Sequence, residues 1–258
     1  MAHELHIENG RASMMYVGKP PWHGLGTALR NPATAEQAIT AANLDWEVVK
    51  TPLHAIDGKV SHPIPDHFAV IRKDWVGQRR PIFGIVGAGY TPLQNRDAFA
   101  FFDAIVGQGA AIYHTAGALG DGERVWVLAK LPGNIRVIGD DIADKFLLLS
   151  NSHDGASAVQ IKFTPIRVVC QNTLTMALNQ GRTLRVPHLS SLHERMRNAV
   201  DMLGIITHQF QMIEGKFQEM AGRQINNVQL DRYLNLVFPD PQDPENENAR
   251  ANSKSLSR

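Results

Sequence analysis

The stretch KFLLLSNSHDGASAVQIKFTPIRVVCQNTLTMALNQ, residues 145–180, decides the fold. Its first half holds two mainly apolar runs, 145–152 and 157–163, with Asp154-Gly155 between them. Runs of this length separated by a turn dipeptide predict two antiparallel strands joined as a hairpin. The sequence therefore predicts that this part of the chain begins with a sheet.

The second half of the same stretch predicts a helix. Thr164 is a good N-cap, and Pro165 occupies the first helical position, where its missing N–H costs nothing. Apolar and small residues then recur at helical spacing to about Asn179, and Gly181 is expected to end the helix. A hairpin that leads directly into a helix is the unit around which we expect the fold to form.

The rest of the chain repeats this mixture. Period-two patterning predicts strands at 46–56, 67–73, 80–86, 111–118 and 123–131. Turn signals separate two pairs of them, at Asp57-Gly58 and at Asp121-Gly122. A capping box of Thr34 and Gln37 predicts a helix at 35–44, and Asn95 is expected to cap another that ends at Gly107. The predicted class is α+β, with an antiparallel sheet and hairpins packed against helices.

Residues 190–222 carry the strongest periodicity in the sequence. Apolar residues repeat every seven positions in two series, which predicts one long C-terminal amphipathic helix with a seam similar to that of a coiled coil. This helix would pack across its own sheet or pair with another subunit. A short helix at 228–237 is expected to follow it.

These elements suggest three parts. Residues 1–30, rich in Gly, Pro and aromatic residues, are expected to form an irregular arm. Residues 31–238 are expected to form a single α+β domain that includes the helices at 190–222 and 228–237. Residues 239–258 lose their apolar residues and gain polar ones, which predicts disorder.

Composition excludes several classes of protein. The 258 residues are 43% apolar, so the chain can build a core, and the formal net charge is +1. A single cysteine excludes a disulfide framework and a cysteine-rich zinc module. The N-terminus lacks the order of a secretory signal, and no apolar run is long enough for a membrane helix. We therefore expect a cytoplasmic protein with no membrane partner.

Motifs for catalysis or cofactor binding are weak or missing. Gly84-Ile85-Val86-Gly87-Ala88-Gly89 superficially suggests a dinucleotide loop, but Pro92 occupies the place of the third glycine, so we interpret these residues as a turn. No phosphate-cradling loop ending in Gly-Lys-Ser/Thr is present. Cys170 lies on an apolar helix face and is expected to be buried. His188 and His193 have the wrong spacing for one helix face. We expect no enzyme activity, cofactor or metal.

Charge is unevenly distributed along the chain. The stretch 159–198 contains six positive residues and one acid, Glu194, so its net charge is +5 over forty residues. Between 72 and 80 four positive residues face Asp74, which leaves +3. The positive residues that we expect to contact DNA outside the hairpin–helix unit are Arg72, Lys73, Arg79, Arg80, Arg182 and Arg185. These clusters are either solvated faces or a nucleic-acid surface.

The hairpin–helix unit favours the second interpretation. Lys162 ends the predicted strand, and Arg167 lies in the first turn of the predicted helix, whose N-terminus offers unpaired N–H groups and a positive dipole end. Such a convergence predicts a phosphate site. Gln171 and Asn172 continue the helix off its apolar stripe, so they either face solvent or bond phosphate, sugar or base edges.

Three segments carry a resemblance to a known family. Residues 167–174 (RVVCQNTL), 90–95 (YTPLQN) and 22–26 (WHGLG) resemble motifs of a family of uncharacterised proteins labelled phage- or plasmid-like. More distantly, the order strand, hairpin, strand and helix resembles the core of the Rad-fifty-two type single-strand annealing proteins. That resemblance implies oligomeric rings whose basic groove holds single-stranded DNA by its backbone and leaves the bases free to pair, without ATP.

Three functions follow as hypotheses. The first is a single-stranded DNA-binding protein that promotes ATP-independent annealing of complementary strands in homologous recombination, as a homo-oligomer with no nucleotide cofactor. The second is a phage- or plasmid-encoded protein-interaction factor that acts on a host partner through the heptad helix. The third is an enzyme acting on a nucleotide or nucleic acid through Cys170 or a histidine cluster.

Overall fold

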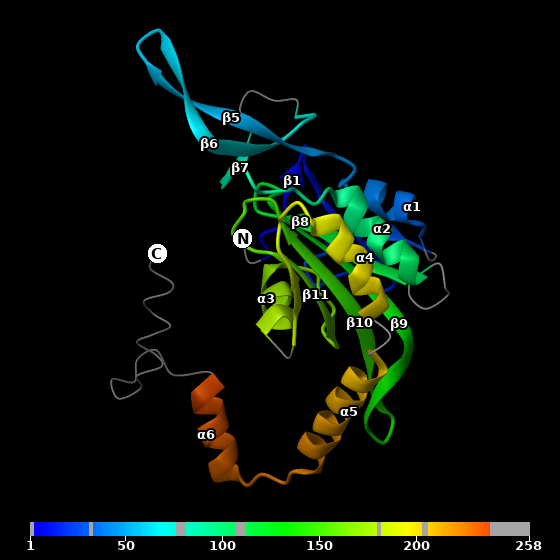
Figure 1. The fold of residues 1–258 in the computed structure, drawn as a ribbon. Helices are drawn as coiled ribbons and strands as arrows, with labels where there is room; N and C mark the ends of the chain where they lie inside the picture. Colours follow the sequence, from blue (N-terminus) through cyan, green and yellow to red (C-terminus); the bar gives the residue numbers. More distant parts are fainter. Residues whose placement is uncertain are drawn as a thin grey trace.

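The computed structural model describes residues 3–30, 33–75, 81–106, 112–179, 182–202 and 206–237. A seven-stranded sheet forms the body of the molecule (Figure 1). Its strands, in spatial order, are β12 (Leu184–Val186), β11 (Val159–Thr164), β10 (Asp141–Ser152), β9 (Arg124–Ile138), β8 (Ile112–Leu119), β3 (Met14–Val17) and β4 (Thr27–Leu29). Neighbouring strands are antiparallel except β3 and β4, which are parallel.

The hairpins predicted from turn dipeptides are confirmed, but β9 and β10 are longer than predicted. Asp121-Gly122 connects β8 to β9, and Asp154-Gly155 follows β10. Pro132 and Gly133 do not end β9, which continues with β10 as a projecting ribbon to the turn at 139–140. Both residues are exposed there, and a register shift near Asp144 absorbs the irregularity.

The N-terminal residues are not the irregular arm that their composition suggested. Strands β1 (Ile7–Glu8) and β2 (Arg11–Ala12) pair with each other, whereas β3 pairs with β8 and β4 in the main sheet. Met14 and Met15 in β3 are fully buried. These strands are two to four residues long, which is too short for a period-two pattern to emerge.

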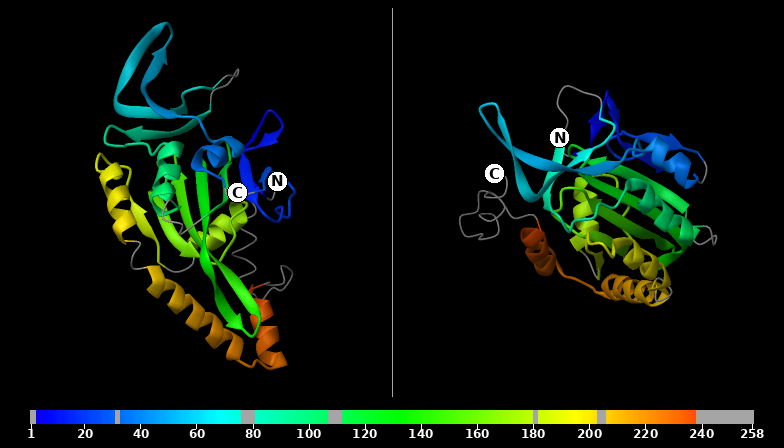
Figure 2. Two further views of the ribbon diagram at one scale, coloured as in Figure 1. Left: turned by 90° about the vertical axis from the view of Figure 1, so that its right-hand side faces the viewer. Right: turned by 45° about the horizontal axis from the view of Figure 1, so that its top comes forward.

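A second sheet projects from one end of the body. It contains β5 (Val48–Asp57), β6 (Val60–Arg72) and β7 (Ile82–Gly87), and beyond β7 the first two strands continue as a ribbon (Figures 1 and 2). Gly84, which we interpreted as part of a turn, lies within β7. A Cβ at Gly84 would overlap the backbone of Asp154, so glycine allows β7 to approach the β10–β11 turn.

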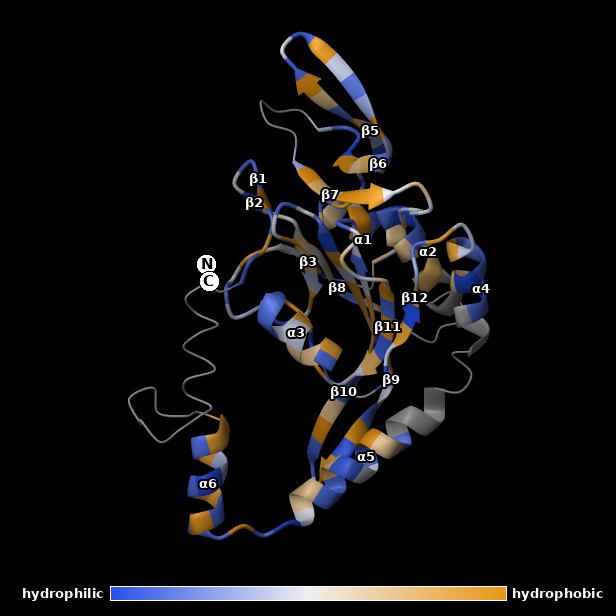
Figure 3. Ribbon diagram, turned by 60° about the vertical axis from the view of Figure 1, so that its left-hand side comes forward, coloured by the Kyte–Doolittle hydropathy of each residue, from blue (hydrophilic) through white to orange (hydrophobic). Residues whose placement is uncertain are grey.

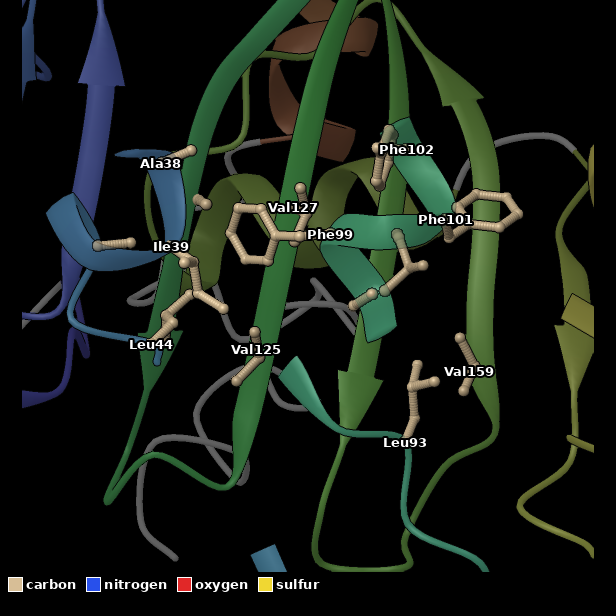
Figure 4. Packing of buried hydrophobic residues seen from close by; sticks show 14 of the residues in the cluster. Ala38, Ile39, Leu44, Leu93, Phe99, Phe101, Phe102, Val125, Val127 and Val159 are labelled. Carbon is tan, nitrogen blue, oxygen red and sulfur yellow. The ribbon is translucent and has the colours of Figure 1, made fainter. Parts of the chain in front are cut away.

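The main sheet separates two hydrophobic clusters. On one face lie α1 (Ala35–Ala41) and α2 (Asn95–Val106), whose Ile39, Phe99 and Phe102 pack over Val125 and Val127 (Figure 4). The predicted capping box of Thr34 and Gln37 begins α1. Trp126 and Leu128 point to the opposite face, into a second cluster with α3 (Gln171–Asn179).

Helix α3 begins six residues later than predicted. Thr164 is the last residue of β11, where it pairs with Phe146, and so cannot cap a helix. Cys170 is the N-cap, since its carbonyl accepts the Leu174 N–H. The Thr173 hydroxyl accepts the N–H groups of Val169 and Cys170 at 2.9 and 3.0 Å. Thr173, a threonine inside the first turn, thus fixes where α3 starts.

The single helix predicted at 190–222 is not supported. The structure has α4 (Leu192–Met202) and α5 (Ile206–Gly222), and residues 203–205 lie outside the described residues. Helix α5 lies along β9, where Glu214 accepts the Arg136 N–H and Ile213 and Phe217 are partly buried. The predicted tail at 239–258 also lies outside the described residues.

The last described helix is α6 (Asn227–Val237), which matches the helix predicted at 228–237. Asn226 and Gln229 form a capping box at its start. Every residue of α6 is exposed, and the helix lies away from the sheet body (Figure 1). In the described part of the chain, no helix combines the length and the apolar character needed to cross a membrane.

Candidate functional site

Helix α3 is the only described helix on its face of the main sheet, and we call this surface the α3 face. Leu174 and Ala177 are buried beneath it, whereas Asn172, Thr175 and Met176 are exposed. The other helices that pack on the main sheet lie on the opposite face (Figure 2). The α3 face includes most of the residues that the sequence assigned to DNA binding.

Lys162 does not lie at the helix N-terminus as predicted. It is 3% exposed, and its Nζ donates to the carbonyl oxygen of Leu178 at 3.1 Å, near the C-terminal end of α3. Burial lowers the pKa of this ammonium. The side chain therefore holds the helix onto β11 and is not directed at a phosphate in solvent.

Arg167 also differs from its predicted place. It precedes α3, and its Nη2 donates to the carbonyl oxygens of Lys19 at 2.6 Å and Val17 at 3.4 Å. Burial lowers the pKa of the guanidinium, whereas Asp144 and Tyr16 raise it. Arg167 thus fastens the N-terminal segment to the chain before α3. The predicted convergence of Lys162, Arg167 and a helix N-terminus is absent.

Two motifs that are far apart in the sequence meet at the start of α3. His23, from residues 22–26, donates from Nε2 to the Val169 carbonyl at 3.0 Å, because its Nδ1 accepts the Leu25 N–H. The carbonyl of His3 accepts the Gln171 N–H. His3 and the WHGLG motif are therefore part of this surface.

Four other residues predicted to bind DNA lie on or beside the α3 face. Asn172 is exposed, and Gln171 is half-buried with its Nε2 donating to Thr175. Arg182 follows α3, and Arg185 lies on the edge strand β12 opposite Gln160. Both arginines are exposed. Because side chains alternate along a strand, Arg185 shares its sheet face with Lys162 and α3.

The two segments that meet here contain no acidic residue. Neither 10–35 nor 155–193 includes an Asp or a Glu, although together they carry Arg11, Lys19, Arg30, Lys162, Arg167, Arg182 and Arg185. The absence of acidic residues is shared by two segments that are far apart in the sequence. A charge count over one continuous stretch of sequence therefore detects only one of them. Lys19 is exposed, and sequence reasoning missed it.

The predicted basic patch at 72–80 is different. Arg72 is 9% exposed, bonds Glu8 and Asp74, and lies over the ring of Trp46. Lys73 is exposed and pairs with Glu47 at 2.8 Å. Arg79 and Arg80 lie outside the described residues. The two described cations are therefore engaged with carboxylates and are not on the α3 face.

The YTPLQN segment, residues 90–95, forms a second cluster on the opposite side. Asn95 does not cap α2: its Nδ2 donates to the Leu44 carbonyl, and its Oδ1 accepts from His153 at 3.0 Å. Gln94 exchanges two hydrogen bonds with the backbone of Val48. The ring of Tyr90 stacks on His188. These side chains fasten α2 to β5 and β10.

Burial governs the ionisation of this cluster. His153 is fully buried beside Trp46 and Phe83, and burial lowers its pKa to about 3. The His188 pKa is lowered in the same way, and burial raises the pKa of Tyr90. Both histidines are thus neutral at physiological pH. Among the described residues, no three His, Cys, Asp or Glu side chains gather to hold a metal.

Comparisons with known proteins place the chain in a family. Residues 82–258, more than half of the chain, match the family described as "Domain of unknown function (DUF932)". The chain therefore belongs to DUF932. No curated protein matches, and no solved structure matches.

Proposed function

We propose that this protein binds single-stranded DNA over the α3 face and promotes annealing of complementary strands without ATP. The observation that supports the proposal is that two stretches without acids, 10–35 and 155–193, meet beside α3 through the His23–Val169 and Lys19–Arg167 contacts. Exposed cations attract phosphates and release their counterions, and Asp144 of β10 is the acid that acts on Arg167 at this surface. The order β9, β10, β11, α3 is also the one that the distant resemblance to the Rad-fifty-two type annealing proteins implies.

The residues proposed to contact DNA differ from the first expectation. Lys19, Asn172, Arg182 and Arg185 have exposed side chains on or beside the α3 face. Lys162 and Arg167 instead hold α3 and the N-terminal segment in place. Annealing requires a scaffold that neutralises repulsion between two backbones, and the proposal therefore involves no catalytic group, cofactor or metal.

The test is fluorescence anisotropy of a labelled single strand across a range of salt concentrations. Reversing two exposed cations, Lys19→Glu with Arg185→Glu, should weaken binding at least tenfold and reduce the magnitude of the salt slope by roughly 1.4, since each phosphate contact contributes about 0.7. The matched control, Lys59→Glu with Lys216→Glu, changes net charge equally on the β5–β6 turn and on α5. It should bind as the wild type does.

Annealing is measured separately, by mixing complementary oligonucleotides with the protein in the absence of nucleotide. Acceleration by the wild type and by the Lys59/Lys216 control, but not by the Lys19/Arg185 variant, is the expected result. Single-strand binding that is absent, or unaffected by salt, would refute the proposal.

The proposal includes a homo-oligomer, and α6 is the surface that best suits subunit contacts. Hydrophobic and hydrophilic residues are interspersed along α6 (Figure 3). Leu230, Tyr233, Leu234 and Val237 recur at helical spacing and are 39% to 58% exposed. An isolated helix of eleven residues is marginal in water. Leu234→Glu should lower the mass measured by light scattering. An unchanged mass would exclude α6 from the subunit contact.

The alternative function is a protein-interaction factor. It was expected to bind its partner through the amphipathic helix predicted at 190–222, which corresponds to α4 and α5. Within α5, however, Ile213 and Phe217 already pack against the core of their own chain. The exposed stripe of α6 would then be the better partner surface. Weak DNA binding, together with a wild-type protein that is monomeric by light scattering, would favour this function.

A further inference from the structure

We propose that Trp22 is a stacking platform for an unpaired nucleobase. The inference rests on the proposed function, since it assigns one side chain on the α3 face to the bases of a bound single strand. Trp22 has an exposed indole, and hydrogen bonds hold the loop on both sides of it.

The loop at 18–26 is held by hydrogen bonds around Trp22. Before the tryptophan, the Lys19 carbonyl accepts from Arg167. After it, the Gly24 N–H donates to Pro21, and the His23 ring bonds Val169. Gly26 adopts φ +105°, where a Cβ would come within 3.0 Å of the Met14 carbonyl. This conformation therefore requires glycine, and the sequence WHGLG provides it.

The indole itself is largely in solvent. Trp22 is 66% exposed and meets His23 edge-on, with ring centroids 5.2 Å apart. Trp46 and Trp126, by contrast, are 4% and 0% exposed. Burying an aromatic side chain is favourable, so an ordered loop that leaves its tryptophan in water forgoes that stabilisation. An exposed ring on a loop that hydrogen bonds hold in place is the arrangement expected of a contact with a ligand.

The surroundings of the ring select the ligand. Lys19 is exposed on the same loop, and the loop's contacts at Val169 and Arg167 place it beside the start of α3. Segment 10–35 has no carboxylate to repel a phosphate. An aromatic face with a nearby cation matches a nucleobase and its phosphate, because bases stack on aromatic rings while lysine neutralises the backbone.

The experiment compares a labelled oligo(dT) with an abasic strand of the same length, by anisotropy at fixed salt. Wild-type protein should bind oligo(dT) more tightly. Trp22→Ala should weaken oligo(dT) binding roughly 5- to 150-fold and leave abasic-strand binding unchanged, whereas Trp22→Phe should recover most of the loss. Ile56→Ala, which removes a 71% exposed side chain from the β5–β6 ribbon, is the matched control. It should bind like the wild type.

A second readout uses the tryptophan emission. Oligo(dT) should quench part of the wild-type emission, and Trp22→Phe should abolish that change. Retention of wild-type affinity by Trp22→Ala would overturn the stacking role of Trp22. It would not contradict the proposed contacts between the protein's cations and the DNA phosphates. Binding of oligo(dT) and the abasic strand with equal affinity would do the same. A wild type that binds neither strand would overturn both this inference and the proposed function.

Discussion

The ammonium of Lys162 donates a hydrogen bond to the carbonyl oxygen of Leu178, which ties strand β11 to the C-terminal end of α3. The last carbonyls of a helix lack partners within it, and a cation there also suits the helix dipole. The aliphatic part of the lysine is buried against the cluster beneath α3. Lys162, which the sequence suggests for DNA binding, thus stabilises the packing of α3 on β11.

Lys162→Met tests that role. Methionine keeps the length of the buried stem and removes the charge, so the free energy of unfolding should change by no more than about 1.5 kcal/mol. Single-strand affinity should stay within roughly twofold of wild type, because Lys162 is only 3% exposed and bonds the Leu178 carbonyl. Urea unfolding and anisotropy measure the two quantities. A folded Lys162→Met protein that no longer binds DNA would restore Lys162 to the DNA-binding surface.

Arg72 provides a second case of a basic residue that serves the fold. Its guanidinium donates to both oxygens of Glu8, at 3.1 and 3.0 Å, and to Asp74. Arg72→Met should destabilise the protein by about 3 kcal/mol, because Glu8 is left partly buried without its cation. Arg72→Lys should recover little, since lysine lacks the planar fork. Urea unfolding measures both, and a loss below about 1 kcal/mol in Arg72→Met would contradict the assignment.

The sequence predicts elements well where local chemistry alone decides them. The Thr34–Gln37 capping box and the turns at Asp57-Gly58, Asp121-Gly122 and Asp154-Gly155 follow from neighbouring residues, and all are confirmed. Thr164-Pro165 fails because β11 pairing holds Thr164 in an extended strand. Long-range pairing thus overrides a strong local signal.

The candidate site is harder to predict, because charge in a sequence carries no direction. Lys162, Arg72 and Arg185 are equivalent in a count of charges, yet only Arg185 is exposed. Sequence reasoning also treated residues 1–30 as an arm and so could not place Lys19 and Trp22 beside α3. The signal that could have found them is the absence of acids in both 10–35 and 155–193.

Asn95 joins three elements, and its removal should be costly. Asn95→Ala leaves the Leu44 carbonyl and the His153 Nε2–H without their partner inside the core. Since each of these two buried unsatisfied groups costs about 1–3 kcal/mol, a loss of about 2–6 kcal/mol is expected in urea unfolding. Asn172→Ala, an exposed asparagine in α3, is the control and should change stability by less than about 0.5 kcal/mol.

His153 makes stability depend on pH. Its pKa is about 3 in the folded chain against an ordinary 6.5, so between these values the unfolded chain binds a proton that the folded chain does not. The contribution of His153 to the free energy of unfolding therefore has its full value above about pH 6.5. Below that pH it falls by about 1.4 kcal/mol per pH unit. His153→Gln should flatten the pH dependence of urea unfolding between about pH 6.5 and 5. An unchanged slope would mean that His153 is protonated in the folded protein.

Gly84 tests whether β7 and the β10–β11 turn are as close as the structure has them. A Cβ at this position would overlap the backbone carbonyl of Asp154, which cannot rotate away as a side chain can. Gly84→Ala should therefore destabilise the protein by about 2 kcal/mol or more in urea unfolding. At Gly89 a Cβ meets no atom within 4 Å, so Gly89→Ala should be neutral or slightly stabilising. Equal stability of the two variants would show that the two segments are farther apart than the structure places them.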